Sequence, residues 1–354
     1  MDNHDNETRE QRLHPHRHHW WRIALLVILG LLVIWLVRFY NSAKSASALM
    51  YKDDGAHISH LIENKKPVSI LMLGIDTGAD GRVDRGNSDT MIVLTLNPQT
   101  KQATMTSIPR DTLARIVGIM PESMQKINAA YNIGSSRMAK RTVSKLLNVP
   151  INYYVTVNMG TLEKVVNDVG GVTVDSKFTI RGNNGTGKVL VHKGKVHLDG
   201  SQALVYVRMR HQDPEGDYGR QKRQQQVIKA LVPKLLSFKG LLHYQQIMNS
   251  IASGMQTDLN FNDIVGLIRH YHGCRKDITS THLQGKTAYI NGSSYQVAPT
   301  SNLQKNSNQL RAQLQLKHEK LNNAETRLNA LNPLFFANTD SIYYDTYGFD
   351  STYY

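Results

Sequence analysis

The chain has 354 residues, and its 42 Lys and Arg outnumber its 28 Asp and Glu, which gives a formal net charge of +14 at pH 7. A balance this basic implies polyanionic partners, whether nucleic acid, acidic lipid or an anionic glycopolymer, and charge alone does not choose among them. The single cysteine, Cys274, excludes an intrachain disulfide and a zinc site of the CxxC type.

Residues 20–40 carry the features of a transmembrane helix. An almost wholly apolar run over residues 24–37 lies between aromatic pairs at 20–21 and 39–40, where interfacial aromatic belts are expected. With these aromatics, the segment approaches the roughly 20 residues that span a bilayer. A cleavable signal peptide is the alternative, since small residues at 45–48 keep a cleavage site open. We favour the uncleaved anchor.

The short tail over residues 1–19 carries Arg9, Arg12 and Arg17. By the positive-inside rule, this tail stays in the cytoplasm and everything after residue 40 lies outside. We therefore expect a single-pass protein of the cell membrane with an extracellular C-terminal domain. That placement argues against a nucleic acid partner.

Strand-like and helix-like segments alternate through residues 68–270, which predicts an α/β fold, an α/β/α sandwich with a mixed central sheet. Apolar runs bounded by turn residues predict strands at residues 68–74, 90–96, 102–108, 153–158 and 172–174. Helical patterns predict helices at residues 126–133, 137–147, 162–169, 221–236, 241–252 and 261–271.

The composition also suggests domain limits. We expect residues 41–66 to form a polar stalk and residues 67–275 to form the main domain, with residues 276–300 as its end or a linker. Residues 301–354 are rich in Gln and Asn, with leucines at roughly helical spacing and a tyrosine-rich tail. We expect an amphipathic helix or weak coiled coil there, followed by a tail from residue 335 that is at least partly disordered.

One stretch is unusually rich in cations and packs five of them into sixteen residues: Arg208, Arg210, Arg220, Lys222 and Arg223. On a strand, Arg208 and Arg210 would share one face. If Asp217 opens a helix, Asp217, Arg220 and Gln224 fall at i, i+3 and i+7 and share another face. A proline and a glycine mark the turn between the two pieces.

Guanidinium groups that converge repel one another unless an anion lies among them, and their fork geometry matches phosphate oxygens. We therefore hypothesise a pyrophosphate clamp in this stretch. The alternative is a solvated basic face on an ordinary surface helix.

Two carboxylates flank the predicted strands at residues 68–74 and 90–96. Asp76 follows the first of these strands and Asp89 precedes the second. Ligands gather at strand ends in open α/β sheets, and Mg²⁺ prefers one or two carboxylates together with phosphate oxygens. Turn and capping roles explain both residues equally well. Arg110 follows a third strand, and its neighbour Asp111 would hold that arginine or cap the next turn.

Six motifs in this order, behind an N-terminal anchor, resemble the LytR–CpsA–Psr family of cell-envelope proteins. They lie at residues 73–76 (LGID), 88–91 (SDTM), 107–111 (SIPRD), 126–130 (KINAA), 170–172 (GGV), and 198–210 with 217–225 (DYGRQKRQQ). Each motif is weak by itself, and together they cover roughly residues 65–240.

The resemblance implies a phosphotransferase of the Gram-positive cell envelope. Such proteins move an anionic glycopolymer, such as wall teichoic acid or capsule, from a polyprenyl-pyrophosphate carrier onto peptidoglycan. A phosphodiester forms and polyprenyl phosphate leaves. The implied cofactor is Mg²⁺, or Mn²⁺ in its place, and the lipid requires an apolar tunnel among the sheet and helices.

The resemblance also implies roles for individual residues. Asp76 and Asp89 match the family's metal ligands. The residues that match its pyrophosphate-binding set are Arg110, Arg208, Arg210, Arg220 and Gln224. Asp217 matches an acidic residue close to the head group. Asp217 or Asp111 would accept the proton of the attacking hydroxyl group, and the alternative role for either is to orient an arginine. The catalytic candidates are therefore Arg110, Asp111 and Asp217.

One position departs from the family pattern. Many members carry arginine two residues before the second metal-site aspartate, where this chain has Asn87. Arg85, or Arg82 in the same loop, would supply that contact to the pyrophosphate.

Two readings of other classes stay open. The first is a membrane-anchored transcriptional regulator, although no helix-turn-helix or zinc module is evident in the sequence. The second is a non-catalytic protein that holds envelope polymers at the cell surface.

Overall fold

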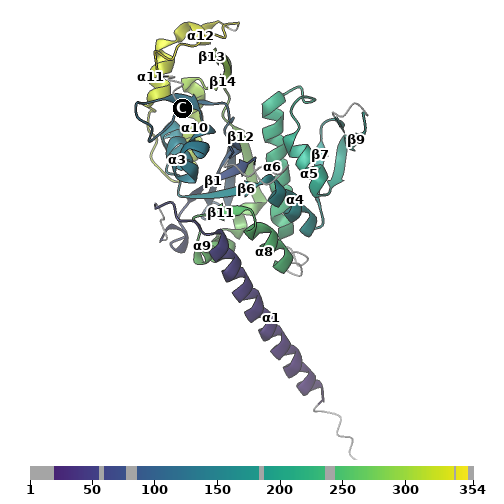
Figure 1. Ribbon diagram of the computed structural model, residues 1–354. Helices are drawn as coiled ribbons and strands as arrows, with labels where there is room; N and C mark the ends of the chain where they lie inside the picture. The colour runs from purple at the N-terminus through teal and green to yellow at the C-terminus, as the bar shows by residue number, and fades with distance from the viewer. Residues whose placement is uncertain are drawn as a thin grey trace, which may run out of the picture. The chain divides into compact units, whose positions relative to one another are not determined.

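The computed structural model (Figure 1) describes residues 20–55, 60–76, 86–182, 187–235, 244–338 and 340–349. The chain divides into two units, residues 1–42 and residues 43–354, and helix α1 (Trp20–Met50) begins in the first and ends in the second. No helix of the described residues combines the length and apolar character needed to cross a bilayer. The anchor expected over residues 20–40 stays a prediction.

A six-stranded mixed sheet forms the centre of the second unit, in the order β11-β6-β1-β2-β3-β12. Its strands are β1 (Val68–Ile75), β2 (Ser88–Asn97), β3 (Gln102–Ser107), β6 (Tyr153–Asn158), β11 (Met255–Thr257) and β12 (Asp277–His282). β1 pairs antiparallel with β2 and parallel with β6, and β3 pairs parallel with β12. The predicted mixed central sheet is confirmed.

Helices cover both faces of this sheet (Figure 1). Because side chains alternate along a strand, Leu71 and Leu73 of β1 pack toward α3 (Ala129–Leu147) and α10 (Thr300–Gln313). Met72 faces the other side. The helices on that side are α2 (His60–Glu63), α4 (Met159–Asp168), α5 (Gly200–Arg208), α6 (Gly216–Leu235), α8 (Tyr244–Ala252) and α9 (Phe261–His270).

Short two-stranded sheets surround this core. They are β4 (Leu113–Arg115) with β5 (Met124–Lys126), β7 (Val172–Ser176) with β10 (Gly194–Leu198), β8 (Ile180–Arg181) with β9 (Val189–Val191), and β13 (Lys286–Ile290) with β14 (Ser293–Val297). The remaining helices are a 3₁₀ turn, η1 (His272–Lys276), together with α11 (Ala324–Leu331) and α12 (Pro333–Ala337).

The strand considered for Arg208 and Arg210 is not formed, because this segment consists of the end of helix α5 and the turn that follows it. Asp199 caps the helix by accepting a hydrogen bond from the Gln202 amide at 2.8 Å, and the Gln202 side chain bonds the Asp199 amide at 3.1 Å. This capping box starts a helix. Arg208 is its last residue, and Arg210 follows in the turn.

The C-terminal segment also differs from the expectation, since its described residues fold onto the domain. Leu303, Leu310 and Leu321 are buried in the core beside α3, and Phe335 and Tyr344 are buried in a second cluster with β13 and β14. The sequence shows the leucine spacing, but the surface that buries these leucines is contributed by distant segments. The C-terminal helices and the hairpin β13–β14 form a lobe, here called the C-terminal lobe.

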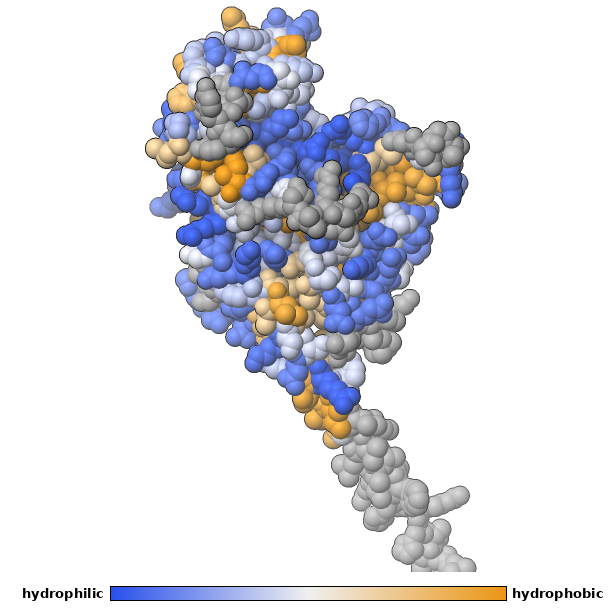
Figure 2. All heavy atoms as spheres, in the orientation of Figure 1, coloured by the Kyte–Doolittle hydropathy of each residue, from blue (hydrophilic) through white to orange (hydrophobic). Residues whose placement is uncertain are grey.

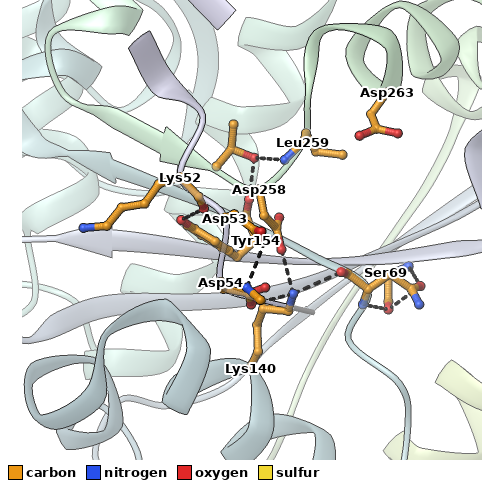
Figure 3. Close-up of polar contacts among 12 residues, drawn as sticks. Lys52, Asp53, Asp54, Ser69, Lys140, Tyr154, Asp258, Leu259 and Asp263 are labelled. Carbon is orange, nitrogen blue, oxygen red and sulfur yellow. Dashed lines mark hydrogen bonds and ion pairs between the residues drawn. The ribbon is translucent and has the colours of Figure 1, made fainter. Parts of the chain in front are cut away.

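The segment expected as a stalk is bound to the domain at its start. Tyr51 forms a β-bridge with Thr257, and the Lys52 amide donates to the Thr257 carbonyl at 2.8 Å. Asp54 is buried beside Lys140 (Figure 3), whose ammonium group lies 2.8 Å from Asp54 and 2.6 Å from Asp258. A buried ion cluster therefore joins the chain that follows α1 to the core.

Candidate functional site

The two candidate metal ligands lie beside each other at the ends of neighbouring strands. Gly74 of β1 pairs with Thr90 of β2, whereas Ile75 pairs with Ser88, so Asp89 is the extra residue of a β-bulge. Bulges redirect side chains next to active sites. Asp76 follows β1 directly, and its amide donates to the Asn87 carbonyl at 3.5 Å.

Arg110 contacts the start of β2 through Asp89. Its Nη1 lies 2.6 Å from Asp89 Oδ1, and its Nε lies 3.6 Å from Asp111 Oδ2. Asp111 Oδ1 is in turn 3.2 Å from Lys126 Nζ. The carboxylate of Asp111 therefore lies between two cations and orients both.

Helix α6 supplies the next group. It begins at Gly216, so Asp217 lies in its first turn, whereas the helical pattern predicted a start at residue 221. Arg220 is buried, and its Nη2 lies 2.6 Å from Asp217 Oδ1 and 3.4 Å from the Asp89 carbonyl. Gln221 donates to the other oxygen of Asp217 at 2.9 Å. Gln224 lies one turn further along and donates to the Val207 carbonyl at 3.4 Å.

The end of α5 completes the cluster. Arg208 Nη2 lies 3.7 Å from Asp76 Oδ1, and 42% of the Arg208 side chain is exposed, so this guanidinium is open to a ligand. The charge of Arg210 is close enough to Arg220 to lower the pKa of Arg220. Arg110, Arg208 and Arg220 are thus paired with Asp89, Asp76 and Asp217 in turn, and Arg210 lies near Arg220.

The balance of charge in the cluster favours an anionic ligand. Burial lowers the pKa of Arg220, and the neighbouring charges of Arg110 and Arg210 lower it further against the attraction of Asp217. The pKa of Arg110 is raised, because the hydrogen bond and charge of Asp89 outweigh its burial. The charged form of Arg220 is therefore disfavoured by burial and by its cationic neighbours, and a phosphate group beside it would offset both effects.

Arg223 has a different role from the other arginines of the stretch. It faces α5 and the turn that follows it, where its Nε donates to the Tyr206 carbonyl at 2.9 Å and its other nitrogens bond Asp213 and the Met209 carbonyl. The guanidinium also lies 5.5 Å from the centre of the Phe178 ring. Arg223 therefore holds the turn that carries Arg210, a positioning role that the sequence did not distinguish.

An apolar cavity of about 230 Å³ lies between the sheet and helices α4, α5, α6 and α8. Its lining includes Met72, Val155, Leu162, Val227, Leu231 and Ile251. Gly74, Thr90 and Gln224 also line it. Since Thr90 adjoins Asp89 and Gln224 lies one helical turn from Arg220, the cavity reaches the charged cluster. A ligand with an apolar chain and an anionic head would fit this combination.

The residues present also fit a divalent metal ion. Asp76 and Asp89 provide two carboxylates at the ends of paired strands, and each lies beside an arginine. Mg²⁺ is commonly held by one or two carboxylates, with phosphate oxygens and water as its other ligands. Among the described residues, no group of three or more His, Cys, Asp or Glu side chains is placed to hold a metal, so a phosphate ligand would have to complete the coordination.

Arg85, the residue expected to replace the missing family arginine, lies outside the described residues, as does Arg82. Asn87 is described and contributes its carbonyl to the strand end. Its substitution for arginine therefore leaves the pairing of β1 with β2 intact.

This fold and site define a class of protein: an α/β domain in which an arginine and carboxylate cluster adjoins an apolar cavity. The chain belongs to the LytR_cpsA_psr family, whose model matches residues 33–312.

Named relatives agree with this assignment. The chain is 42% identical over 256 residues to the polyisoprenyl-teichoic acid–peptidoglycan teichoic acid transferase TagU of Enterococcus faecalis. This match covers 72% of this chain and 82% of the relative. It is also 36% identical over 344 residues to Biofilm regulatory protein A of Streptococcus mutans, and that match covers 94% of this chain and 81% of the relative. The crystal structure of Bacillus subtilis TagV superposes with a TM-score of 0.62 at 34% identity and covers 72% of this chain and 99% of that one.

Proposed function

We propose that this protein is a transferase that moves an anionic glycopolymer from a polyprenyl-pyrophosphate carrier onto peptidoglycan, with formation of a phosphodiester. The observation that carries the proposal is the cluster of Arg110, Arg208, Arg210 and Arg220 at the edge of an apolar cavity. The name of the Enterococcus faecalis relative describes the same reaction class for that protein.

The two halves of the site suit the two halves of the carrier. The cavity below Gly74 and Gln224 would take the polyprenyl chain, because its lining is almost wholly apolar. The guanidinium groups would bind the pyrophosphate oxygens. Arg110 and Arg208 form ion pairs with Asp89 and Asp76, and Arg208 is the more exposed of the two.

Catalysis by this cluster would rest on charge stabilisation. In phosphoryl transfer the protein mainly positions the reactants and stabilises the charge that develops on the leaving phosphate. Arg220 is fixed by Asp217, so it needs little reorganisation when this charge develops. Asp217 and Asp111 each hold two partners, which favours an orienting role for both over that of a proton acceptor.

Asp76 and Asp89 would hold Mg²⁺, or Mn²⁺ in its place, and a bound ion would neutralise part of the pyrophosphate charge. When the carboxylates bind the metal, Arg110 and Arg208 would turn from them to the phosphate oxygens. We also propose that residues 20–40 anchor the protein in the cell membrane, with the N-terminus cytoplasmic and the domain extracellular.

Removal of single arginines tests the clamp. In Arg110→Ala and Arg210→Ala, transfer of the polymer to peptidoglycan should fall by about 10²–10³-fold, because each variant loses a group that stabilises the transition state. The measurement is incorporation of labelled polymer into purified peptidoglycan, with circular dichroism to show that each variant is folded. Lys195→Ala, at an exposed position of β10, is the control. Normal transfer in folded Arg110→Ala would remove the clamp from this account.

Substitution of a metal ligand tests the ion. Asp76→Asn should raise the Mg²⁺ concentration needed for half-maximal transfer by at least about tenfold, since one of two carboxylates loses its charge. Full activity of the unsubstituted protein in the presence of excess chelator would contradict the proposed metal site.

A further inference from the structure

Two adjoining cavities hollow the C-terminal lobe, away from the apolar cavity. One has a volume of about 260 Å³ and the other of about 380 Å³. They share Arg115, Ala324 and Arg327 in their linings, so they form one continuous depression, here called the C-terminal groove. Its walls come from β4, the end of α3, the chain that precedes α11 and α11 itself.

The C-terminal groove carries an excess of positive charge. Four cations line it: Arg115, Lys145, Lys320 and Arg327. Its two carboxylates are already engaged, since Glu122 lies 2.6 Å from Arg115 and buried Glu325 accepts a hydrogen bond from the Arg115 amide at 2.8 Å.

Three of these cations are available to a ligand. Within the part of the chain that the structure describes, Lys145, Lys320 and Arg327 have no carboxylate at ion-pair distance. Arg327 donates to the Asn322 side chain at 3.3 Å, and all three residues are exposed.

The same groove offers surfaces for uncharged parts of a saccharide. Asn148, Asn322 and Asn323 line its cationic part, and amides of this kind bond hydroxyl groups as donors and acceptors. Phe349 and Leu331, which are 47% and 55% exposed, line the other part. An apolar side chain of this kind can pack against the C–H face of a sugar ring. Figure 2 shows apolar residues exposed among polar ones on this lobe.

The C-terminal groove is connected to the arginine cluster by a single short strand. The chain runs from Arg110 and Asp111 directly into β4, whose last residue is Arg115. Five residues span at most roughly 18 Å, even when fully extended. A polymer whose pyrophosphate end lies at Arg110 is therefore within a short distance of the groove.

We propose that the C-terminal groove binds the phosphate-bearing chain of the transferred polymer, downstream of its pyrophosphate end. This inference rests on the proposed function for the identity of the polymer. A polymer that carries phosphate groups is favoured as the ligand. A lysine ammonium group binds phosphate as a point charge, and an arginine guanidinium group can bind two phosphate oxygens at once. Lys320, Arg327, Leu331 and Phe349 all follow residue 312, where the match to the family model ends, so the groove is built largely from chain beyond that match.

The test measures binding without catalysis. The probe is soluble poly(glycerol phosphate) that carries neither lipid nor pyrophosphate, titrated into the full chain in detergent. Lys320→Glu combined with Arg327→Glu should weaken binding about tenfold and flatten its dependence on salt, because two attractive contacts become repulsive. The matched control, Lys195→Glu, reverses an exposed charge on β10 and should leave the affinity unchanged.

Other outcomes separate this inference from the proposed function. Arg110→Ala should still bind the probe, so a loss of transfer in that variant leaves the groove intact. Equal affinity of the doubly reversed variant and the unsubstituted protein would overturn the proposal. A polygalacturonate probe that binds as tightly, and is weakened by the same reversal, would assign the groove to a carboxylate-bearing glycan and overturn it as well.

Discussion

Gly74 shows how a single residue sets the geometry of the site. A Cβ atom at this position would lie 2.8 Å from Thr90 Cβ and 2.9 Å from Thr90 Oγ1, closer than side-chain contacts allow. The close approach of β1 to β2 at this point adjoins the bulge that displays Asp89. The glycine is therefore needed for space, and the position of a candidate metal ligand depends on it.

We expect Gly74→Ala to lower the free energy of unfolding by about 1–3 kcal/mol, because the added methyl group overpacks the strand pair. Transfer activity should fall by more than the loss of folded protein accounts for, since any shift of β2 also moves Asp89. The double variant Gly74→Ala/Thr90→Gly removes the clash and should regain part of both losses. Denaturant titration and a transfer assay on Gly74→Ala, Thr90→Gly and the double variant check this, and strictly additive effects would contradict the proposed contact.

The arginines illustrate a second point at the scale of residues. Arg220 and Arg223 are three positions apart on α6, yet Arg220 faces the strand ends, whereas Arg223 bonds the Tyr206 and Met209 carbonyls. Their local sequence is nearly the same. The role of each guanidinium depends on which neighbouring segment its side chain reaches.

At the scale of elements, the buried ion cluster of Figure 3 joins three segments that are distant in the sequence. Lys140 on α3 donates hydrogen bonds to Asp258 at 2.6 Å and to the Asn152 carbonyl at 3.0 Å, and it forms an ion pair with Asp54 at 2.8 Å. Asp258 also accepts a hydrogen bond from the Tyr154 amide at 2.7 Å. The cluster fixes the chain that follows α1 against β6.

Lys140→Met should destabilise the domain by about 3–5 kcal/mol, because two buried carboxylates lose their common cation. Lys145→Met, at an exposed position of the same helix, is the matched control and should change stability by less than about 0.5 kcal/mol. Urea denaturation of both variants at pH 7.5 is the measurement. Equal stabilities would show that the cluster contributes nothing to holding the segments together.

The effect of Lys140→Met should also depend on pH. Burial raises the pKa of Asp258 in the folded protein, and the charge of Lys140 opposes this rise. Without Lys140 the pKa should rise further, so the folded variant binds a proton more readily than its unfolded chain. Stability from such a group is present below the unfolded pKa and is lost as the pH rises through the folded value. The destabilisation should therefore be smaller at pH 5 than at pH 7.5, and a pH-independent difference would contradict this account.

At the scale of the whole molecule, the C-terminal segment completes the domain. The core that packs against β1 includes Leu303 and Leu310 of α10, and the hairpin β13–β14 packs with Phe335 of α12. The same segment provides most of the C-terminal groove. The domain and its second proposed binding surface therefore form together.

The orientation in the membrane gives a prediction for the intact cell. If residues 20–40 anchor the protein as proposed, a protease added to protoplasts should digest the domain, while an epitope placed at the N-terminus stays protected. A domain that resists digestion until the protoplasts are lysed would contradict this topology. That result would favour the regulatory reading, with the domain on the side of the membrane where DNA lies.

The sequence by itself determined which segments form the central strands β1, β2, β3 and β6, and it contains the motifs that identify the family. These properties depend on local periodicity, turn residues and short spacings, which neighbouring residues alone establish. Only the tertiary structure decided that Lys140 lies between Asp54 and Asp258 and that the C-terminal leucines are buried. The physical reason is that these properties depend on contacts between residues far apart in the chain, where packing and burial outweigh local preference.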